Sequence, residues 1–176
     1  MSSIIKLLKK RKRSVKNYKC SDIEGVVRKG LYAKGYRYRT NVYPLPGRPD
    51  LVLHKYNAII FINGCYWHAH NCNLFKVPAS NRGSWLRRFG ETVDRDEKNI
   101  KNLLERGWRV CIVWECSIKN NKSEVLNYLS SWIKGSKIFL EIREEDLNFF
   151  EINKSVSSNL ISEIEGNRGE KNSLCH

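Results

Sequence analysis

Apolar residues recur along this chain at two spacings, which together predict alternating helices and strands. The segment 21–24, SDIE, has the pattern of a helix capping box, and the apolar positions after it repeat at helical spacing up to Gly35. Residues 36–42 alternate aromatic and charged side chains, which predicts an edge strand, and three prolines between 44 and 49 then interrupt regular structure.

Beyond the prolines the pattern predicts a sheet and its covering helices. Residues 51–53 and 58–62 read as strands joined by a short turn, and the second, without a polar residue, is expected to be central. A helix is expected over 94–106, after a shorter helical stretch at 84–89, and a buried strand over 108–114.

The last elements expected are a helix that ends at Gly135, with apolar positions from 125 to 133, and a short strand over 138–142. The order of helices and strands predicts an α/β fold, with one mixed central sheet flanked by helices on both faces.

Composition limits the chain to one such domain, and charge divides it further. The chain has 176 residues, 41% of them hydrophobic, and a net charge of +14. Residues 1–60 carry 15 Lys and Arg against 3 Asp and Glu, whereas residues 141–176 carry 4 against 8. We therefore expect a basic arm at 1–20, a folded domain at 21–142 and an acidic tail at 143–176.

The apolar runs are too short for a membrane-spanning helix, and the basic segment near Met1 does not resemble a secretory signal. These features predict a cytoplasmic protein. Its six cysteines are then better interpreted as thiols or metal ligands than as disulfides.

Metal-ligating residues are concentrated in GCYWHAHNC, which follows the apolar strand at 58–62. Cys65, His70 and Cys72 are the ligand types that tetrahedral zinc prefers, and Cys116, just beyond the strand at 108–114, would complete the set if the two strands are neighbours. Four protein ligands predict a structural zinc ion; the alternative is that these are unrelated thiols and a surface histidine.

Asp50 and His68 are the candidates for catalysis. Asp50 opens an apolar strand, where a carboxylate is suited to holding Mg²⁺, unless it serves only as a turn residue. His68 lies between the zinc ligands without being needed by them, so a fixed loop can direct its imidazole at a water molecule; a surface histidine is the alternative. Together they predict metal-assisted phosphodiester hydrolysis.

Two further features indicate nucleic acid as the substrate. The segment KKRKRSVKNYK, which includes Arg13 and Lys16, is suited to neutralising backbone phosphates, although a solvated basic tail without a partner has the same composition. Tyr66, Trp67 and Trp85 are aromatic residues suited to stacking on bases or entering between base steps, with core packing as the alternative.

Over roughly residues 21–134 the chain resembles the very-short-patch repair (Vsr) DNA mismatch endonucleases. The motifs that carry the resemblance are PGRPD, GCYWH with a following HNC, LFKVP, a Trp before a helix that contains Arg-Asp, and GWRVCIVWEC. The resemblance implies a restriction-endonuclease-like fold with a structural zinc. It also implies an enzyme that nicks DNA 5′ to the thymine of a T·G mismatch left by deamination of 5-methylcytosine.

Carried over position by position, the resemblance implies roles for individual residues. Asp50 binds catalytic Mg²⁺ with the backbone carbonyl of Ile62, His68 activates the attacking water, and Glu24 supports the site. Asn63 stands where the best-known members have a histidine, and it cannot act as an acid or base. The zinc ligands are Cys65, His70, Cys72 and Cys116, and the aromatics that wedge into DNA are Tyr66, Trp67 and Trp85.

The expected protein is thus a monomeric, Mg²⁺-dependent and strand-specific endonuclease held together by zinc, associated with the bacterial nucleoid. Its partners are double-stranded DNA with a T·G mismatch and other repair proteins, and no membrane. Two alternatives remain at this stage: a zinc-ordered mismatch-binding module without catalysis, and a restriction-type endonuclease. The aromatic pair beside His68 favours a ligand of distorted DNA over the second alternative.

Overall fold

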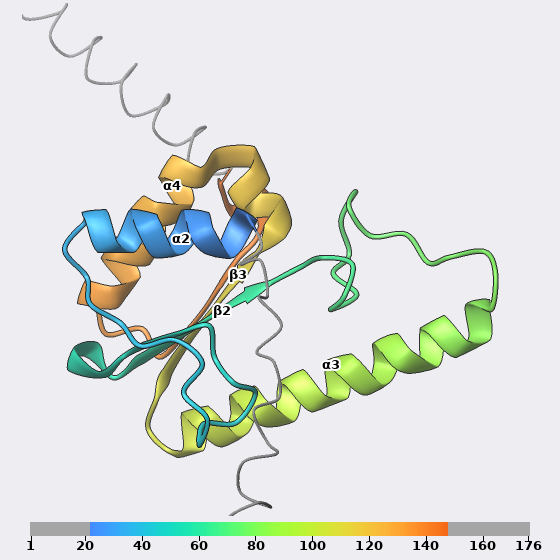
Figure 1. The fold of residues 1–176 in the computed structure, drawn as a ribbon, viewed down its shortest axis with the longest axis horizontal. Helices are drawn as coiled ribbons and strands as arrows, with labels where there is room; N and C mark the ends of the chain where they lie inside the picture. The colour runs from blue at the N-terminus through green and yellow to red at the C-terminus, as the bar shows by residue number, and fades with distance from the viewer. Residues whose placement is uncertain (1–21, 148–176) are drawn as a thin grey trace, which may run out of the picture.

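The structure, a computed structural model, describes residues 22–147 (Figure 1). It contains one four-stranded sheet in the order β1-β2-β3-β4, formed by β1 (Leu51–Leu53), β2 (Ala58–Asn63), β3 (Arg109–Trp114) and β4 (Phe139–Ile142). β1 pairs with β2 in antiparallel orientation, whereas β2, β3 and β4 are parallel. The expected mixed α/β sheet is therefore confirmed.

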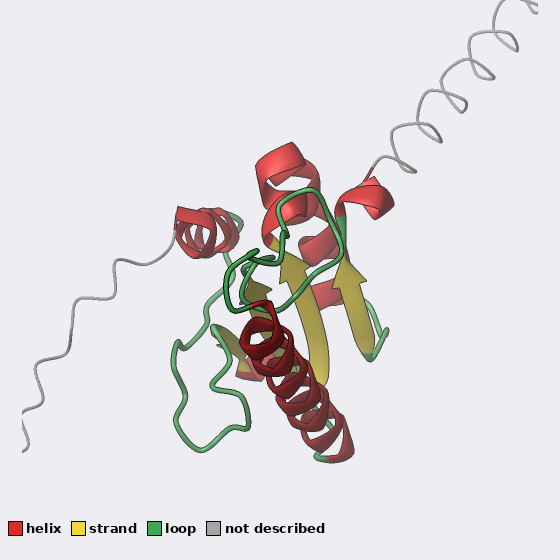
Figure 2. Ribbon diagram, turned by 90° about the vertical axis from the view of Figure 1, so that its right-hand side faces the viewer, coloured by secondary structure: helices red, strands yellow, loops and turns green. Residues whose placement is uncertain are grey.

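Helices cover both faces of this sheet, as the sequence predicts (Figures 1 and 2). α2 (Asp22–Ala33) and α4 (Glu115–Lys134) lie together on one face, and α3 (Arg82–Glu105) crosses the other. The core under α2 and α4 includes Val27, Leu31 and Leu129, and Leu103 of α3 is buried against Val52 on the opposite face. Apolar residues on both faces of the short strands produce this three-layer arrangement.

Three elements differ from the prediction. The prediction of an edge strand over 36–42 is wrong. Only Arg39 pairs with the sheet, in one antiparallel bridge to Val52. The backbone of Asn41 lies in the left-handed region (φ 50°), where a strand does not continue. The two helical stretches expected at 84–89 and 94–106 form the single helix α3. α4 begins at Glu115, earlier than expected, and contains a non-helical residue, Asn121.

The register of the sheet brings the predicted site together. In the parallel pair β2–β3, Asn63 lies opposite Trp114, so the two strands end at the same edge. The loop that contains GCYWHAHNC leaves β2 there, and the first turn of α4 leaves β3 beside it. In the antiparallel pair β1–β2, Leu51 lies opposite Ile60, which places the start of β1 near the same edge.

None of the helices between residues 22 and 147 is long and apolar enough to cross a membrane.

Candidate active site and metal centre

The four predicted zinc ligands converge at the edge where β2 and β3 end. Cys65, His70 and Cys72 come from the loop after β2, Cys116 comes from the first turn of α4, and their ligand atoms all lie within 4.8 Å of one another. The Sγ of Cys116 lies 3.6 Å from the Nδ1 of His70. A tetrahedral zinc ion with Zn–S of about 2.3 Å and Zn–N of about 2.0–2.1 Å separates these atoms by about 3.6 Å, so the cluster fits the ion.

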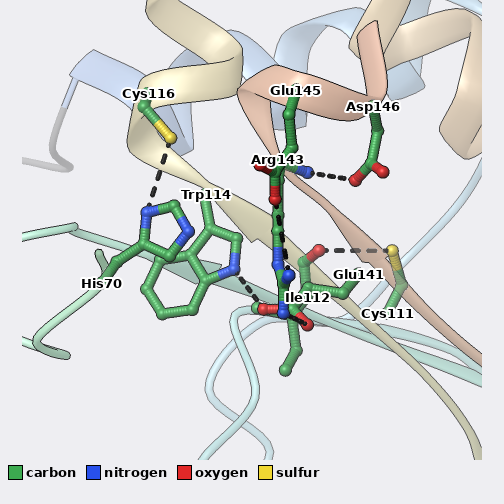
Figure 3. A network of polar contacts seen from close by, with 9 residues as sticks. All are labelled: His70, Cys111, Ile112, Trp114, Cys116, Glu141, Arg143, Glu145 and Asp146. Carbon is green, nitrogen blue, oxygen red and sulfur yellow. Dashed lines mark hydrogen bonds and ion pairs between the residues drawn. The ribbon is translucent and has the colours of Figure 1, made fainter. Parts of the chain in front are cut away.

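The surroundings hold this cluster in place. The ring of His70 is stacked on Trp114, with 4.0 Å between ring centroids and 12° between planes, and Figure 3 shows it directed at Cys116. The indole N–H of Trp114 donates to Glu141 at 2.6 Å, and Arg143 donates to the same carboxylate at 2.7 Å. These hydrogen bonds connect the cluster to Glu141 on β4 (Figure 3). Both parallel neighbours of β3, namely β2 and β4, therefore contribute residues to the site.

The thiols are suited to a cation. Burial raises the pKa of the Cys65 and Cys116 thiols, so at neutral pH they need a bound cation to become thiolates. The backbone N–H of Cys116 points at the Sγ of Cys65 at 3.4 Å, which favours negative charge on that sulfur. The donor set of three cysteines and one histidine is one that structural zinc sites use.

Asp50 lies directly before β1, with its carboxylate directed at β2. Its Oδ2 accepts a hydrogen bond from the backbone N–H of Ile62 at 2.7 Å. Burial raises the pKa of Asp50 to about 6, the Ile62 hydrogen bond opposes this rise, and the nearby charge of Glu24 on α2 adds to it. A partly buried carboxylate with another carboxylate close by is a poor arrangement without a cation and a suitable one for Mg²⁺.

His68 lies near the same edge, because it lines one cavity together with Asn63 at the end of β2 and Gly47 in the loop before Asp50. The ring is half-buried, and its Nδ1 lies 2.5 Å from the Oδ2 of Asp96 on α3. Burial favours the neutral form of Asp96, but hydrogen bonds from His68 and Arg95 outweigh it and lower the pKa of Asp96 below its usual value. An ionised Asp96 fixes the ring of His68 through Nδ1 and leaves Nε2 as the nitrogen that can accept a proton.

Asp96 was not among the residues predicted for the site. One feature of the sequence indicates Asp96. It precedes Ile100 by four residues and Leu103 by seven, so it lies on the apolar face of the helix, which its carboxylate interrupts. Only the fold shows that the loop with His68 passes over this position of α3.

Two cavities border the pair formed by His68 and Asp96. A small one of about 120 Å³ lies between Gly47, Phe61 and this pair. A larger one of about 860 Å³ lies on the side of α3 that faces β4, and Glu141 contributes to its wall. The imidazole therefore has open space beside it rather than close packing, as a residue that meets a substrate requires.

The three predicted aromatics lie together but differ in exposure. Trp67 is 63% exposed, whereas Tyr66 and Trp85 are half-buried. The ring of Tyr66 contacts Trp67, Trp85 and Phe89 edge-on, with centroid distances of 5.2, 5.9 and 5.6 Å. Tyr66 and Trp85 therefore pack within an aromatic cluster, whereas the indole of Trp67 projects from it. Arg13 and Lys16 lie outside the described residues.

Comparisons with known proteins identify the family of this chain. Residues 6–74 match the family described as DNA mismatch endonuclease Vsr. The DNA mismatch endonuclease Vsr of Escherichia coli K12 is 39% identical over 122 residues, which cover 67% of this chain and 78% of the relative. This chain belongs to the Vsr family.

Other proteins similar to this chain are named as nicking enzymes. The type II nicking enzyme V.NmeAIP of Neisseria meningitidis serogroup A is 43% identical over 113 residues, 63% of this chain and 81% of the relative. The type II nicking enzyme V.HpaIIP of Haemophilus parainfluenzae is 33% identical over 111 residues, 62% of this chain and 78% of the relative. The family is thus one of DNA endonucleases.

Proposed function

We propose that this protein is a strand-specific, Mg²⁺-dependent endonuclease that nicks DNA 5′ to the thymine of a T·G mismatch left by deamination of 5-methylcytosine. The observation that carries the proposal is that Asp50 precedes β1 and bonds to Ile62 near the end of β2, while His68, held by Asp96, lines a cavity at that same end of β2. Membership in the Vsr family supports the substrate, and the relatives named as nicking enzymes support cleavage of one strand.

The proposed magnesium site consists of the Asp50 carboxylate and the backbone carbonyl of Ile62, with Glu24 supporting it from α2. The hydrogen bond from Ile62 N–H to Asp50 supports this pairing, since it keeps the two residues adjacent. A bound Mg²⁺ would supply Lewis-acid polarisation of the phosphate. The pKa of Asp50 is raised in the absence of the metal ion's positive charge.

His68 is the proposed general base. Its Nε2 takes a proton from water as the water oxygen attacks phosphorus, the bond from phosphorus to one sugar oxygen breaks, and that oxygen leaves and is protonated from solvent. The ionised Asp96 stabilises the imidazolium that forms. Asp96 acts through His68 and is therefore a positioning residue. Asn63, at the end of β2, is buried and cannot titrate, so we assign it no acid or base role.

The zinc cluster is proposed as structural, because protein donors fill four positions and His68 lies between two of them in sequence. Zinc would hold the loop that carries His68 against α4. Trp67, supported by Tyr66 and Trp85, is proposed to enter the helix beside the mismatch, since its indole is the exposed member of the cluster. Arg13 and Lys16 are proposed to bind backbone phosphates, and the restriction-endonuclease-like fold and monomeric state belong to the same proposal.

The test is cleavage of duplexes that carry one T·G pair, in several methylase contexts, with each strand labelled by a different dye. We expect a single nick in the T strand that requires Mg²⁺, and no cut in matched duplexes. The matched control for His68→Ala is His54→Ala, because His54 lies at the opposite end of β1 and β2 and packs on Trp108. His68→Ala should abolish nicking, and His54→Ala should not.

Each alternative gives a different result. Cleavage of both strands in matched duplexes would contradict the proposal and favour a restriction-type enzyme. Mismatch binding without nicking by the wild type, in every context and with Mg²⁺ present, would favour the zinc-ordered binding module. Equal nicking of matched and mismatched duplexes would remove the mismatch specificity from the proposal.

A further inference from the structure

The loop before Asp50 holds an arginine in a backbone conformation that does not favour it. Arg48 has φ 51°, directly after Gly47 at φ 73° and before the buried Pro49. Glycine adopts this left-handed region freely, whereas a long side chain with a Cβ adopts it at a cost in conformational energy. Because strained backbone positions cluster at functional sites, we expect the side chain of this arginine to have a function.

The loop is held firmly against the domain. Val42 and Leu45 pack on the core cluster under α3. At Gly47 an added Cβ would lie 3.2 Å from both the ring of Phe61 on β2 and the side chain of Asn99 on α3. Figure 1 shows this loop, in cyan, beside the C-terminal half of α3. We call residues 42–48 the 42–48 loop; its inner side is fixed by these contacts.

The outer side of the 42–48 loop carries an exposed pair. The guanidinium carbon of Arg48 lies 5.5 Å from the ring centroid of Tyr43, which is 80% exposed. Within residues 22–147, no carboxylate pairs with the Arg48 side chain and no carbonyl accepts a hydrogen bond from it. A cation resting on an aromatic face keeps all five N–H donors available to a ligand.

A second arginine in the chain shows the contrast. Arg37 lies 4.2 Å from the ring centroid of Tyr32 after α2, and its guanidinium also donates to the backbone carbonyls of Tyr32 and Tyr36. That arginine is used by the protein itself, which makes it a matched control for Arg48.

The 42–48 loop also borders the candidate active site. Arg48 precedes Asp50 by two residues, and Gly47 lines the same 120 Å³ cavity as His68 and Asp96. A phosphodiester backbone that reaches Asp50 and His68 therefore passes next to this loop. Guanidinium groups bind phosphate oxygens through two parallel hydrogen bonds, so the chemistry of the free fork fits this neighbour.

We propose that Arg48, supported by Tyr43, binds a backbone phosphate of the strand that is cut and so positions that strand at Asp50 and His68. The proposal rests on the proposed function to the extent that DNA is the substrate. Phosphates carry no sequence information, so the contact contributes equally to binding of matched and mismatched duplexes.

The experiment compares full-length wild type with Arg48→Ala, Arg48→Gly and Arg37→Ala. Binding to labelled matched and mismatched duplexes is measured by fluorescence anisotropy without Mg²⁺ at several salt concentrations, and nicking is measured under single turnover. We expect both Arg48 variants to raise Kd about tenfold for both duplexes and to reduce the salt slope by about one. Arg37→Ala should bind as the wild type does.

Arg48→Gly separates binding from folding. Because glycine fits φ 51° without strain, the thermal midpoint of Arg48→Gly should equal or exceed that of the wild type, while its DNA binding is about tenfold weaker. Tyr43→Ala should weaken binding less than Arg48→Ala, since the charge remains.

The proposal is overturned if Arg48→Ala and Arg48→Gly keep the Kd and salt slope of the wild type. It is also overturned if only the mismatched duplex binds more weakly, which would indicate contact with a base edge instead of a phosphate. A wild type that binds DNA through Arg48 but nicks no duplex would contradict the proposed function and leave this inference standing. If the wild type nicks mismatched duplexes and the Arg48 variants bind DNA normally, the proposed function stands and this inference is contradicted.

Discussion

Replacing Asp50 with asparagine is expected to stabilise the metal-free protein at neutral pH and to abolish nicking. Asp50 has a partly buried carboxylate whose pKa burial raises from 3.8 to about 6, with Glu24 adding to the effect. The folded state therefore binds a proton more tightly than the unfolded state between about pH 4 and pH 6. The stability associated with this group is present at low pH and is lost as pH rises through about 6.

The size of the effect follows from the two pKa values. The difference between 3.8 and about 6 corresponds to about 3 kcal/mol of unfolding free energy lost above pH 6. The asparagine in Asp50→Asn would carry no charge, and its side-chain oxygen can still accept the N–H of Ile62, at a loss of about 1 kcal/mol relative to a carboxylate. We expect a net gain of about 2 kcal/mol at pH 7, or about 4–8 °C in Tm.

The assay is thermal and urea unfolding of wild type and Asp50→Asn from pH 4 to pH 8, with Mg²⁺ absent and then present. Asp94→Asn is the control, because Asp94 is an exposed aspartate on α3. Mg²⁺ should stabilise the wild type and the control but not Asp50→Asn. Equal pH dependence of the wild type and Asp50→Asn would refute the reasoning, and so would equal stabilisation of both by Mg²⁺.

Three other perturbations test separate parts of the structure. Asp96→Asn should lower the single-turnover nicking rate about 10- to 100-fold with Kd for DNA unchanged, because His68 loses its orienting carboxylate; a change in Kd alone would contradict this. Cys116→Ala should reduce zinc, measured by mass spectrometry, from one per chain to substoichiometric and lower Tm, and zinc content equal to that of the wild type would speak against the cluster. Gly30→Ala should destabilise by about 1–3 kcal/mol in urea unfolding, since its Cβ would lie 2.4 Å from Leu126 between α2 and α4; an increase in stability would show that Leu126 moves freely.

The sheet and the metal cluster were predictable because their signals are local. The apolar runs of β2 and β3 each indicated a buried strand, and placing them side by side was enough to bring Cys116 to the loop with Cys65. Close spacing in sequence already constrains three of the four ligands, so only one long-range contact had to be inferred.

The errors came from segments whose structure depends on distant partners. Residues 90–93, which join the two predicted stretches into α3, begin with Gly90 and include no buried residue, so they carry no apolar period. The alternation over 36–42 indicated a strand, but the backbone turns at Asn41 and only Arg39 pairs with β1. Asp96 was not predicted as a site residue, because its contact is with His68, which lies 28 residues earlier in the loop after β2.

The position of His68 inside the span of Cys65 to His70 has a practical consequence for anyone who works with this enzyme. On our proposals, EDTA would act on two ions in this protein, removing the one at Asp50 quickly and the one at the cysteines slowly. A brief EDTA quench should be reversed by magnesium alone. Prolonged storage in EDTA should yield an inactive preparation that recovers only after zinc and a reductant are added, because the loop that carries the imidazole must first be rebuilt.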